Sequence, residues 1–232
     1  MTVGFWIGSS RLVAAALLGV AAATASPAAA QPTLLHLGPP AGTYADRVFP
    51  VGWSPDGRYL ALIVERSGEG ATSGHLVLRV QDLSSDELVV DEQLTPGESE
   101  VAPNLGRVWR EQQSRIQRSL SPYDISSSAV TLQPLPYGGQ PGGPYTAVLS
   151  LRRDRGRVSG YTLSLRDGRT RAKTLESHTF TYSPAYGVRA LGVLAAPSGD
   201  RIVVVVEVAA SGYEGGRTYE YRFVGARTGS GF

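Results

Sequence analysis

The chain has 232 residues, with 22 basic and 20 acidic side chains, a formal net charge of +2 and no cysteine. A charge this close to zero argues against a protein that binds nucleic acid or another polyanion through its net charge. Without cysteine we expect no disulfide bond, no thiolate ligand for a metal and no lipid attached at a cysteine. A mature chain of about 200 residues buries roughly 70% of its unfolded surface, so one domain held together by its core is expected.

Residues 1–30 have the pattern of an export signal. Arg11 is the only charged side chain before Asp46, and it is followed by an apolar stretch and by Ala28-Ala29-Ala30. A secretory peptidase recognises this order, whereas a transmembrane helix needs about 20 apolar residues. The alternative is a buried N-terminal helix. We predict a signal peptide over 1–30, general secretion, and a single β-rich domain over 31–232 that is periplasmic or secreted, with no transmembrane anchor after cleavage.

Most of the mature chain has the period-two alternation of half-buried β-strands. Apolar and polar side chains alternate over residues 76–81, 147–152, 161–166 and 219–223, with turn signals at 154–156 and 167–168. Short turns between strands favour antiparallel meanders. We therefore predict a mainly β fold of antiparallel meander sheets, either a sandwich or an incomplete propeller.

Two segments depart from this alternation. Residues 202–206 are apolar at every position, which predicts either a central strand covered on both faces or an aggregation-prone stretch held in the core. Residues 105–120 repeat their apolar side chains at helical spacing, and Ser121-Pro122 ends the pattern. We predict one amphipathic α-helix that packs on a sheet and buries Trp109. The alternative is a helix that lies on a membrane surface.

The chain contains a short internal repeat. Residues 55–65 align without gaps on residues 197–207, and the two copies share a proline, a glycine, an apolar run and a closing glutamate. Either the two segments are equivalent hairpins of one assembly, or similar turn chemistry has arisen twice.

The first copy also carries a resemblance to known proteins. The run from Trp53 to Ala61, which begins Trp53-Ser54-Pro55-Asp56-Gly57, resembles the blade signature of TolB-type β-propellers, in which blades recur about every 40 residues. The wider order is also informative: an export signal, this motif, a strand ending in Val80-Gln81-Asp82-Leu83, a helix, and a late apolar strand before residues 212–217. It is similar to a bacterial family of predicted secreted proteins with no assigned function. That resemblance implies export and supplies no activity.

No catalytic, metal-binding or cofactor-binding motif is evident. The three histidines have no ligand spacing, and the chain has no Gly-x-Ser-x-Gly elbow and no phosphate-binding Gly-x-x-x-x-Gly-Lys. We predict no catalytic residue, no metal and no cofactor, and we favour a protein that is not an enzyme. A pair of carboxylates that meets only in three dimensions stays possible, because the chain has 20 acids.

Charged residues are unevenly distributed. Residues 82–100 hold seven acids and no base, whereas residues 152–173 hold eight bases and two acids. The basic run is either a patch for an anionic partner or a set of solvated strand edges and turns, for which the acidic run is one candidate neighbour. We favour the second interpretation and expect no nucleic acid partner, because no aromatic side chains alternate with the arginines as single strands require.

The preferred binding site is the loop that holds Tyr213, Glu214 and Arg217. Its glycines let a partner approach the backbone, while an aromatic ring, an acid and an arginine can recognise it. The alternative is a plain connector with a surface ion pair. The leading hypothesis is an exported, non-catalytic binding module of the bacterial cell envelope whose partner is an envelope protein or a polysaccharide. Two others are a cell-envelope hydrolase that uses paired carboxylates and an accessory protein of an outer-membrane assembly.

Overall fold

The computed structural model describes residues 30–38, 44–66, 74–95, 103–138, 143–169, 171–212 and 216–232. Within these ranges the chain forms thirteen β-strands, two α-helices and one 3-10 turn. The predicted mainly β, antiparallel fold is confirmed. The predicted signal peptide lies outside the described residues apart from Ala30. Among the helices in the described ranges, none is long and apolar enough to cross a membrane.

The strands form three sheets, which we name the N-terminal, central and outer sheets. The N-terminal sheet has the order β5 (Glu87–Gln93), β4 (His75–Asp82), β3 (Tyr59–Arg66), β2 (Arg47–Trp53), β6 (Ser126–Ser127). The central sheet has the order β1 (Tyr44–Ala45), β13 (Arg217–Arg227), β12 (Arg201–Ser211), β11 (Gly187–Ala195), β7 (Leu132–Gln133). The outer sheet has the order β10 (Ala172–Thr179), β9 (Arg157–Arg166), β8 (Thr146–Asp154). Only β1 pairs in parallel, with β13, and the other described pairs are antiparallel.

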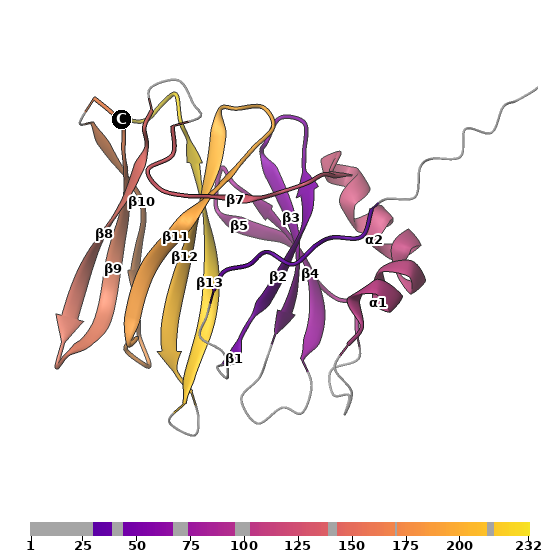
Figure 1. The fold of residues 1–232 in the computed structure, drawn as a ribbon, viewed down its shortest axis with the longest axis horizontal. Coiled ribbons are helices and arrows are strands. Elements are labelled where there is room, and N and C mark those ends of the chain that lie inside the picture. The colour runs from indigo at the N-terminus through magenta and orange to yellow at the C-terminus, as the bar shows by residue number, and fades with distance from the viewer. Residues whose placement is uncertain are drawn as a thin grey trace, which may run out of the picture.

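The sheets are stacked with the central one in the middle. In Figure 1 the outer sheet lies at the left, the central sheet beside it, the N-terminal sheet to the right and the helices at the far right. Apolar side chains fill each of the three interfaces, between the outer and central sheets, between the central and N-terminal sheets, and between the N-terminal sheet and the helices. Each sheet except the outer one is therefore covered on both faces.

Strand β12 shows why residues 202–206 are apolar at every position. Ile202 and Val204 pack in the core against the outer sheet, while Val203 and Val205 pack against the N-terminal sheet. All four side chains are fully buried. The predicted central strand is confirmed, because a strand with an apolar layer on either face has no solvent-facing position left for a polar residue.

The predicted helical segment is present as two short helices, α1 (Leu105–Glu111) and α2 (Gln113–Leu120), followed by the 3-10 turn η1 (Ser121–Tyr123). It packs on the N-terminal sheet and buries Trp109, as predicted. The helix is divided at Gln112, whose φ of -101° and ψ of 6° leave the α-helical region. Since the apolar stripe is buried against the sheet, it is not available to a membrane surface.

The two copies of the repeat form equivalent hairpins. Arg47 faces Glu65 across β2 and β3, and Arg189 faces Glu207 at the corresponding place across β11 and β12. Both arginines form an ion pair with the facing glutamate, at 2.9 Å and 2.6 Å. The turns use matching backbone bonds, because the amides of residues 54 and 196 donate to the carbonyl oxygens of residues 59 and 201, both at 3.0 Å. Each hairpin also holds one bulge. Of the two explanations for the repeat, the structure supports equivalent hairpins.

The two hairpins stack face to back, so that corresponding side chains of the two copies point in the same direction along the stack. Leu60 and Leu62 of the first copy face the central sheet, whereas their counterparts Ile202 and Val204 face the outer sheet. Successive blades of a propeller stack in this way. The chain order differs from a simple series of blades, because the outer sheet follows the N-terminal sheet in sequence but lies beyond the central sheet in space.

We predict that Gly57→Ala lowers the free energy of unfolding by about 2–4 kcal/mol. Gly57 has a φ of +66°, and an added Cβ would lie 2.6 Å from Ser198 Oγ and 2.7 Å from Ala196 Cβ, so the first turn could no longer pack on the second. Gly156→Ala is the control, because Gly156 has a φ of +81° but open space around it. It should cost only about 1 kcal/mol of backbone strain. Equal losses for the two variants in urea unfolding would show that the turns do not depend on each other.

Candidate functional site

The structure describes one of the three residues of the predicted binding loop. Tyr213 and Glu214 lie outside the described residues. Arg217 begins β13, is exposed and pairs with Ser211 of β12. Its guanidinium carbon lies over the ring of Tyr186, 5.0 Å from the centroid. The structure therefore places Arg217 beside Tyr186, which no sequence motif singles out.

The two charged runs do not neutralise each other in the described residues. Three acids of the acidic run, Asp82, Asp91 and Glu92, form ion pairs with arginines at positions 58, 79 and 115, which lie outside the basic run. Within the basic run, Arg171 pairs with the neighbouring Asp167. Among the described residues no acid of 82–95 forms an ion pair with the basic run, whose arginines at 152, 153, 155 and 166 are exposed to solvent.

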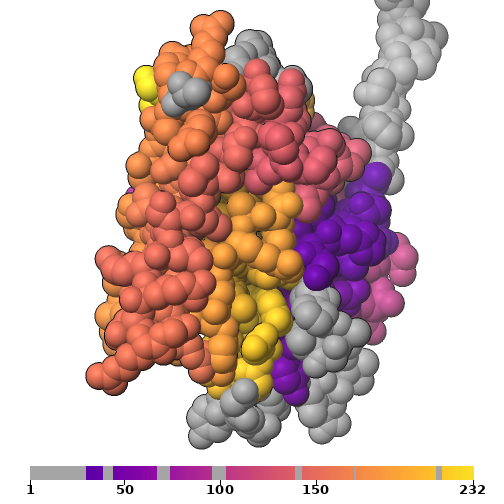
Figure 2. All heavy atoms as spheres, turned by 60° about the vertical axis from the view of Figure 1, so that its left-hand side comes forward, coloured from indigo at the N-terminus to yellow at the C-terminus, as the bar shows by residue number. Residues whose placement is uncertain are grey.

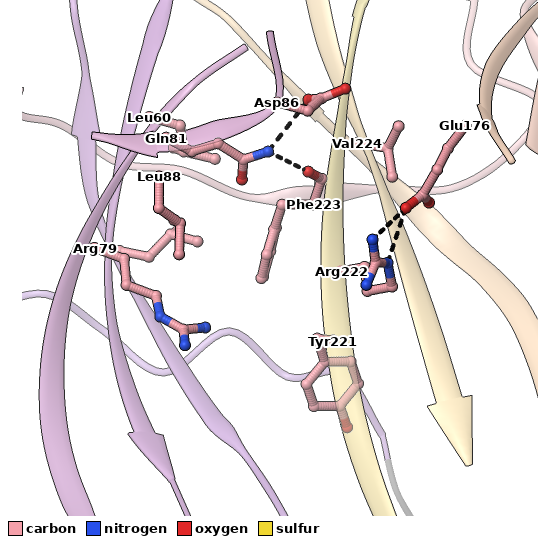
Figure 3. Close-up of a pocket in the computed structure, with 11 residues that line it drawn as sticks. Leu60, Arg79, Gln81, Asp86, Leu88, Glu176, Tyr221, Arg222, Phe223 and Val224 are labelled. Atoms are coloured by element: carbon pink, nitrogen blue, oxygen red, sulfur yellow. Dashed lines mark hydrogen bonds and ion pairs between the residues drawn. The ribbon is translucent and has the colours of Figure 1, made fainter. Parts of the chain in front are cut away.

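A groove follows the free edge of β13, and we call it the β13 groove (Figure 3). Strand β1 covers this edge only at Thr218 and Tyr219, and no other described strand pairs with it there. Two hollows, of about 200 Å³ and about 510 Å³, share their walls at Arg79, Tyr221 and Arg222. The smaller hollow lies where the edges of all three sheets meet, and it is lined by Leu60, Leu62, Arg79, Gln81, Asp86, Leu88, Glu176, Tyr221, Arg222, Phe223 and Val224.

Two side chains, one from β4 and one from the β4–β5 turn, make hydrogen bonds with backbone groups of β13 that a neighbouring strand would otherwise make. Gln81 Nε2 donates to the carbonyl oxygen of Phe223 at 2.6 Å, and the amide of Gly225 donates to Asp86 Oδ1 at 2.8 Å (Figure 3 shows the first contact). Gln81 also donates to Asp86 Oδ1 at 3.2 Å. Asp86 reaches the edge from the β4–β5 turn, where its φ of 58° is a conformation that aspartate tolerates. These bonds satisfy backbone groups that would otherwise attract another strand.

The groove holds two carboxylates in different settings. Burial raises the pKa of Asp86, and the nearby negative charge of Glu176 acts in the same direction, while the bond from Gly225 opposes them. Glu176 accepts from the Tyr161 hydroxyl at 2.7 Å and from Arg222 Nε at 3.0 Å. Both carboxylates are thus hydrogen-bonded to the protein, and the negative charge of Glu176 is also paired with the positive charge of Arg222.

Tyr221 is the one described groove residue with a buried, unpaired polar atom. Its side chain is buried, and its hydroxyl has no hydrogen-bond partner among the described atoms. Burial raises the pKa of Tyr221 to about 12, with the charge of Glu207 adding to the effect. Buried polar groups are nearly always hydrogen-bonded, so a groove-lining tyrosine whose hydroxyl has no partner suits a ligand that reaches this hydroxyl on binding.

The described residues contain no group of three or more histidines, aspartates or glutamates that lie close enough together to hold a metal ion. His178 packs instead against aromatic rings, with its ring 4.8 Å from that of Phe180. Comparison with known proteins adds no assignment, because no family model, curated protein or solved structure matches the chain.

No motif in the sequence indicates the residues of the β13 groove. Gln81 and Phe223 are 142 positions apart, so no local motif could place them together. The one available signal was Val80-Gln81-Asp82-Leu83 at the end of a strand, but that motif does not indicate a partner.

We predict opposite effects for two substitutions of Asp86. Asp86→Ala removes the acceptor for Gly225 and Gln81 and places alanine at positive φ, so it should lower the free energy of unfolding by about 1–3 kcal/mol. Asp86→Asn keeps the acceptor oxygen and the tolerated backbone conformation, so the fold should persist.

The effect of Asp86→Asn should depend on pH with a definite sign. Because the folded-state pKa of Asp86 is raised, the wild type loses stability as the pH rises through that pKa and the carboxyl group ionises. Asparagine cannot ionise, so the variant should gain stability relative to the wild type between acidic and neutral pH. Urea unfolding at several pH values measures this difference. If the variant instead lost stability relative to the wild type as the pH rises, the raised pKa of Asp86 would be contradicted.

Proposed function

We propose that the protein is a non-catalytic binding module of the bacterial cell envelope, and that it holds its partner, an envelope protein or a polysaccharide, in the β13 groove. The observation that carries this proposal is Tyr221, which lines both hollows and whose buried hydroxyl has no described hydrogen-bond partner. The export pattern of residues 1–30 supports the location, and the resemblance to exported proteins supports it too.

The chemistry of the groove suits recognition of a polar ligand. Arg79 lines both hollows and is mostly buried, with 19% of its side chain exposed, so its position is fixed by packing and by Asp91. Phe223 and Leu88 add apolar surface beside it. Binding sites typically combine apolar walls with a few fixed polar groups in this way.

A hydrolase is the second candidate, and one observation favours it. Asp86 has a raised pKa in the same hollow as Glu176, and glycosidases use a protonated acid together with an ionised carboxylate. Against it, Glu176 is paired with Arg222 and Tyr161, and Asp86 holds the edge of β13 through Oδ1. Both carboxylates therefore have a structural role, which leaves binding as the better supported function.

We predict that groove variants lose binding to a defined ligand while the fold is kept. Purified protein is tested on arrays of envelope polysaccharides and envelope-derived peptides, and the strongest ligand is then titrated. Arg79→Ala should weaken its affinity about tenfold or more, and Tyr221→Phe severalfold, because each removes one polar contact. Tyr221→Phe should not lower the melting temperature, since the hydroxyl has no described partner to lose.

Arg107→Ala is the matched control, because Arg107 is an exposed arginine of α1, which packs on the face of the N-terminal sheet away from the central sheet. Equal binding by the wild type and both groove variants would remove the groove as the site. Hydrolysis of an array polysaccharide by the wild type, abolished in Asp86→Asn and Glu176→Gln, would replace the binding proposal with the hydrolase.

A further inference from the structure

A third hollow of about 330 Å³ lies at the start of β13, and its lining includes Tyr186, Arg189, Glu207 and Arg217. Arg157, on the outer sheet, contacts the same Tyr186 ring, with its guanidinium carbon 3.3 Å from the centroid. Figure 2 shows the surfaces of β8–β9 and of β11–β13 next to each other on this side of the molecule. This hollow shares no lining residue with the smaller hollow in Figure 3 and one, Tyr219, with the larger hollow of the β13 groove.

Backbone hydrogen bonds bring the side chains of Arg157, Tyr186 and Arg217 together. Val158 and Ala185 form an isolated β-bridge with two backbone hydrogen bonds, whose nitrogen–oxygen distances are 2.8 Å and 2.9 Å. The bridge brings their chain neighbours Arg157 and Tyr186 together. The amide of Tyr186 donates to the carbonyl oxygen of Ala209 on β12 at 2.7 Å. Arg217 enters from the adjacent strand β13. The cluster of Arg157, Tyr186 and Arg217 is therefore fixed by strands of two sheets.

The two arginines of this cluster have no described counter-ion. Arg189 in the hollow is paired with Glu207 by two bonds, at 2.6 Å and 2.9 Å. Arg157 and Arg217 form no ion pair with any described carboxylate. A guanidinium group that stacks on a ring uses its face, so its N–H edge stays available to an oxyanion.

Two further observations point to an anion at this place. Nη1 of Arg157 is buried and has no hydrogen-bond partner among the described atoms. A buried donor left without an acceptor is costly, and an incoming oxygen would satisfy it. In addition, hydrogen bonding from the side chains of Arg157 and Ser211 lowers the pKa of Tyr186, and the charges of Arg157 and Arg217 act in the same direction.

We propose that Arg157, Tyr186 and Arg217 form a binding site for a phosphate group. A phosphate offers several acceptor oxygens, enough for two guanidinium edges and a phenolic hydroxyl, and arginine binds such groups in bidentate fashion. The site does not depend on the β13 groove. The phosphate can belong to a soluble phosphate ester or to a lipid headgroup, because both present the same chemistry.

Calorimetric titration of the purified protein at low ionic strength tests the site. The soluble probes are inorganic phosphate and glycerol 3-phosphate, and phosphatidylglycerol vesicles are the lipid probe. We expect saturable binding to at least one probe, and the probe that binds identifies the source of the phosphate. Arg157→Lys and Arg217→Lys keep the charge but lose the bidentate edge, and each should weaken binding about tenfold or more. Circular dichroism and the melting temperature check the fold of each variant.

Arg153→Ala is the control, because Arg153 is an exposed arginine of the same β8–β9 hairpin and does not contact the ring. It should change affinity less than about twofold. Absence of binding to all three probes would overturn the proposal. An equal loss in Arg153→Ala would do so as well, since it would show attraction by diffuse positive charge.

Ionisation of Tyr186 gives a second readout that a purely structural cluster would not change. The difference between the ultraviolet titrations of the wild type and Tyr186→Phe isolates this phenol from the other tyrosines. A bound phosphate should raise the pKa of Tyr186, because a neighbouring negative charge disfavours the phenolate. An unchanged titration in saturating phosphate would place the anion elsewhere and overturn the assignment.

Discussion

Burial of β12 on both faces is the constraint on which the rest of the structure depends. An alternating strand would have one layer to cover, but the continuous apolar run over residues 202–206 needs a sheet on each side. The outer and N-terminal sheets supply these layers. With no cysteine in the chain, this apolar packing has no disulfide bond to assist it. The hairpin β2–β3 repeats the pattern of β11–β12, and its own second face is covered by the helices.

Stacking sheets in this way leaves their edges side by side, and the polar features of the molecule gather there. Along β13 the edge is closed at Phe223 and Gly225 by Gln81 and Asp86, so it cannot recruit a foreign strand at those positions. The same contacts create a groove with fixed polar walls. Where β9 and the start of β11 meet through the Val158–Ala185 bridge, the edge instead carries two arginines against one ring. The fold thus offers two chemically different surfaces, one with its charges largely paired and one with positive charge in excess.

The sequence predicts those features whose signal is local. Strand alternation, the fully apolar strand, the helix over residues 105–120 and the equivalence of residues 55–65 and 197–207 all follow from side-chain order within short windows. The break at Gln112 has no such signal, because glutamine is a good helix former. The β13 groove also escapes prediction, since its walls come from strands of three sheets. Arg217 was selected from its loop chemistry, yet Arg157 and Tyr186 beside it are brought there only by tertiary pairing. The bulk of the fold can be read from periodicity, whereas the sites depend on which edges meet.

Native-state hydrogen exchange measures the shared burial of β12 most directly, because it gives the free energy of opening for each amide. We expect the amides of Ile202–Val206 to exchange only through global unfolding, with the same free energy as the protected amides of β3 and β9. That result would show that the three sheets open as one cooperative unit around the central strand. Exchange of β12 at a clearly lower free energy than β3 or β9 would contradict it, because the flanking sheets would then stay folded without the strand between them.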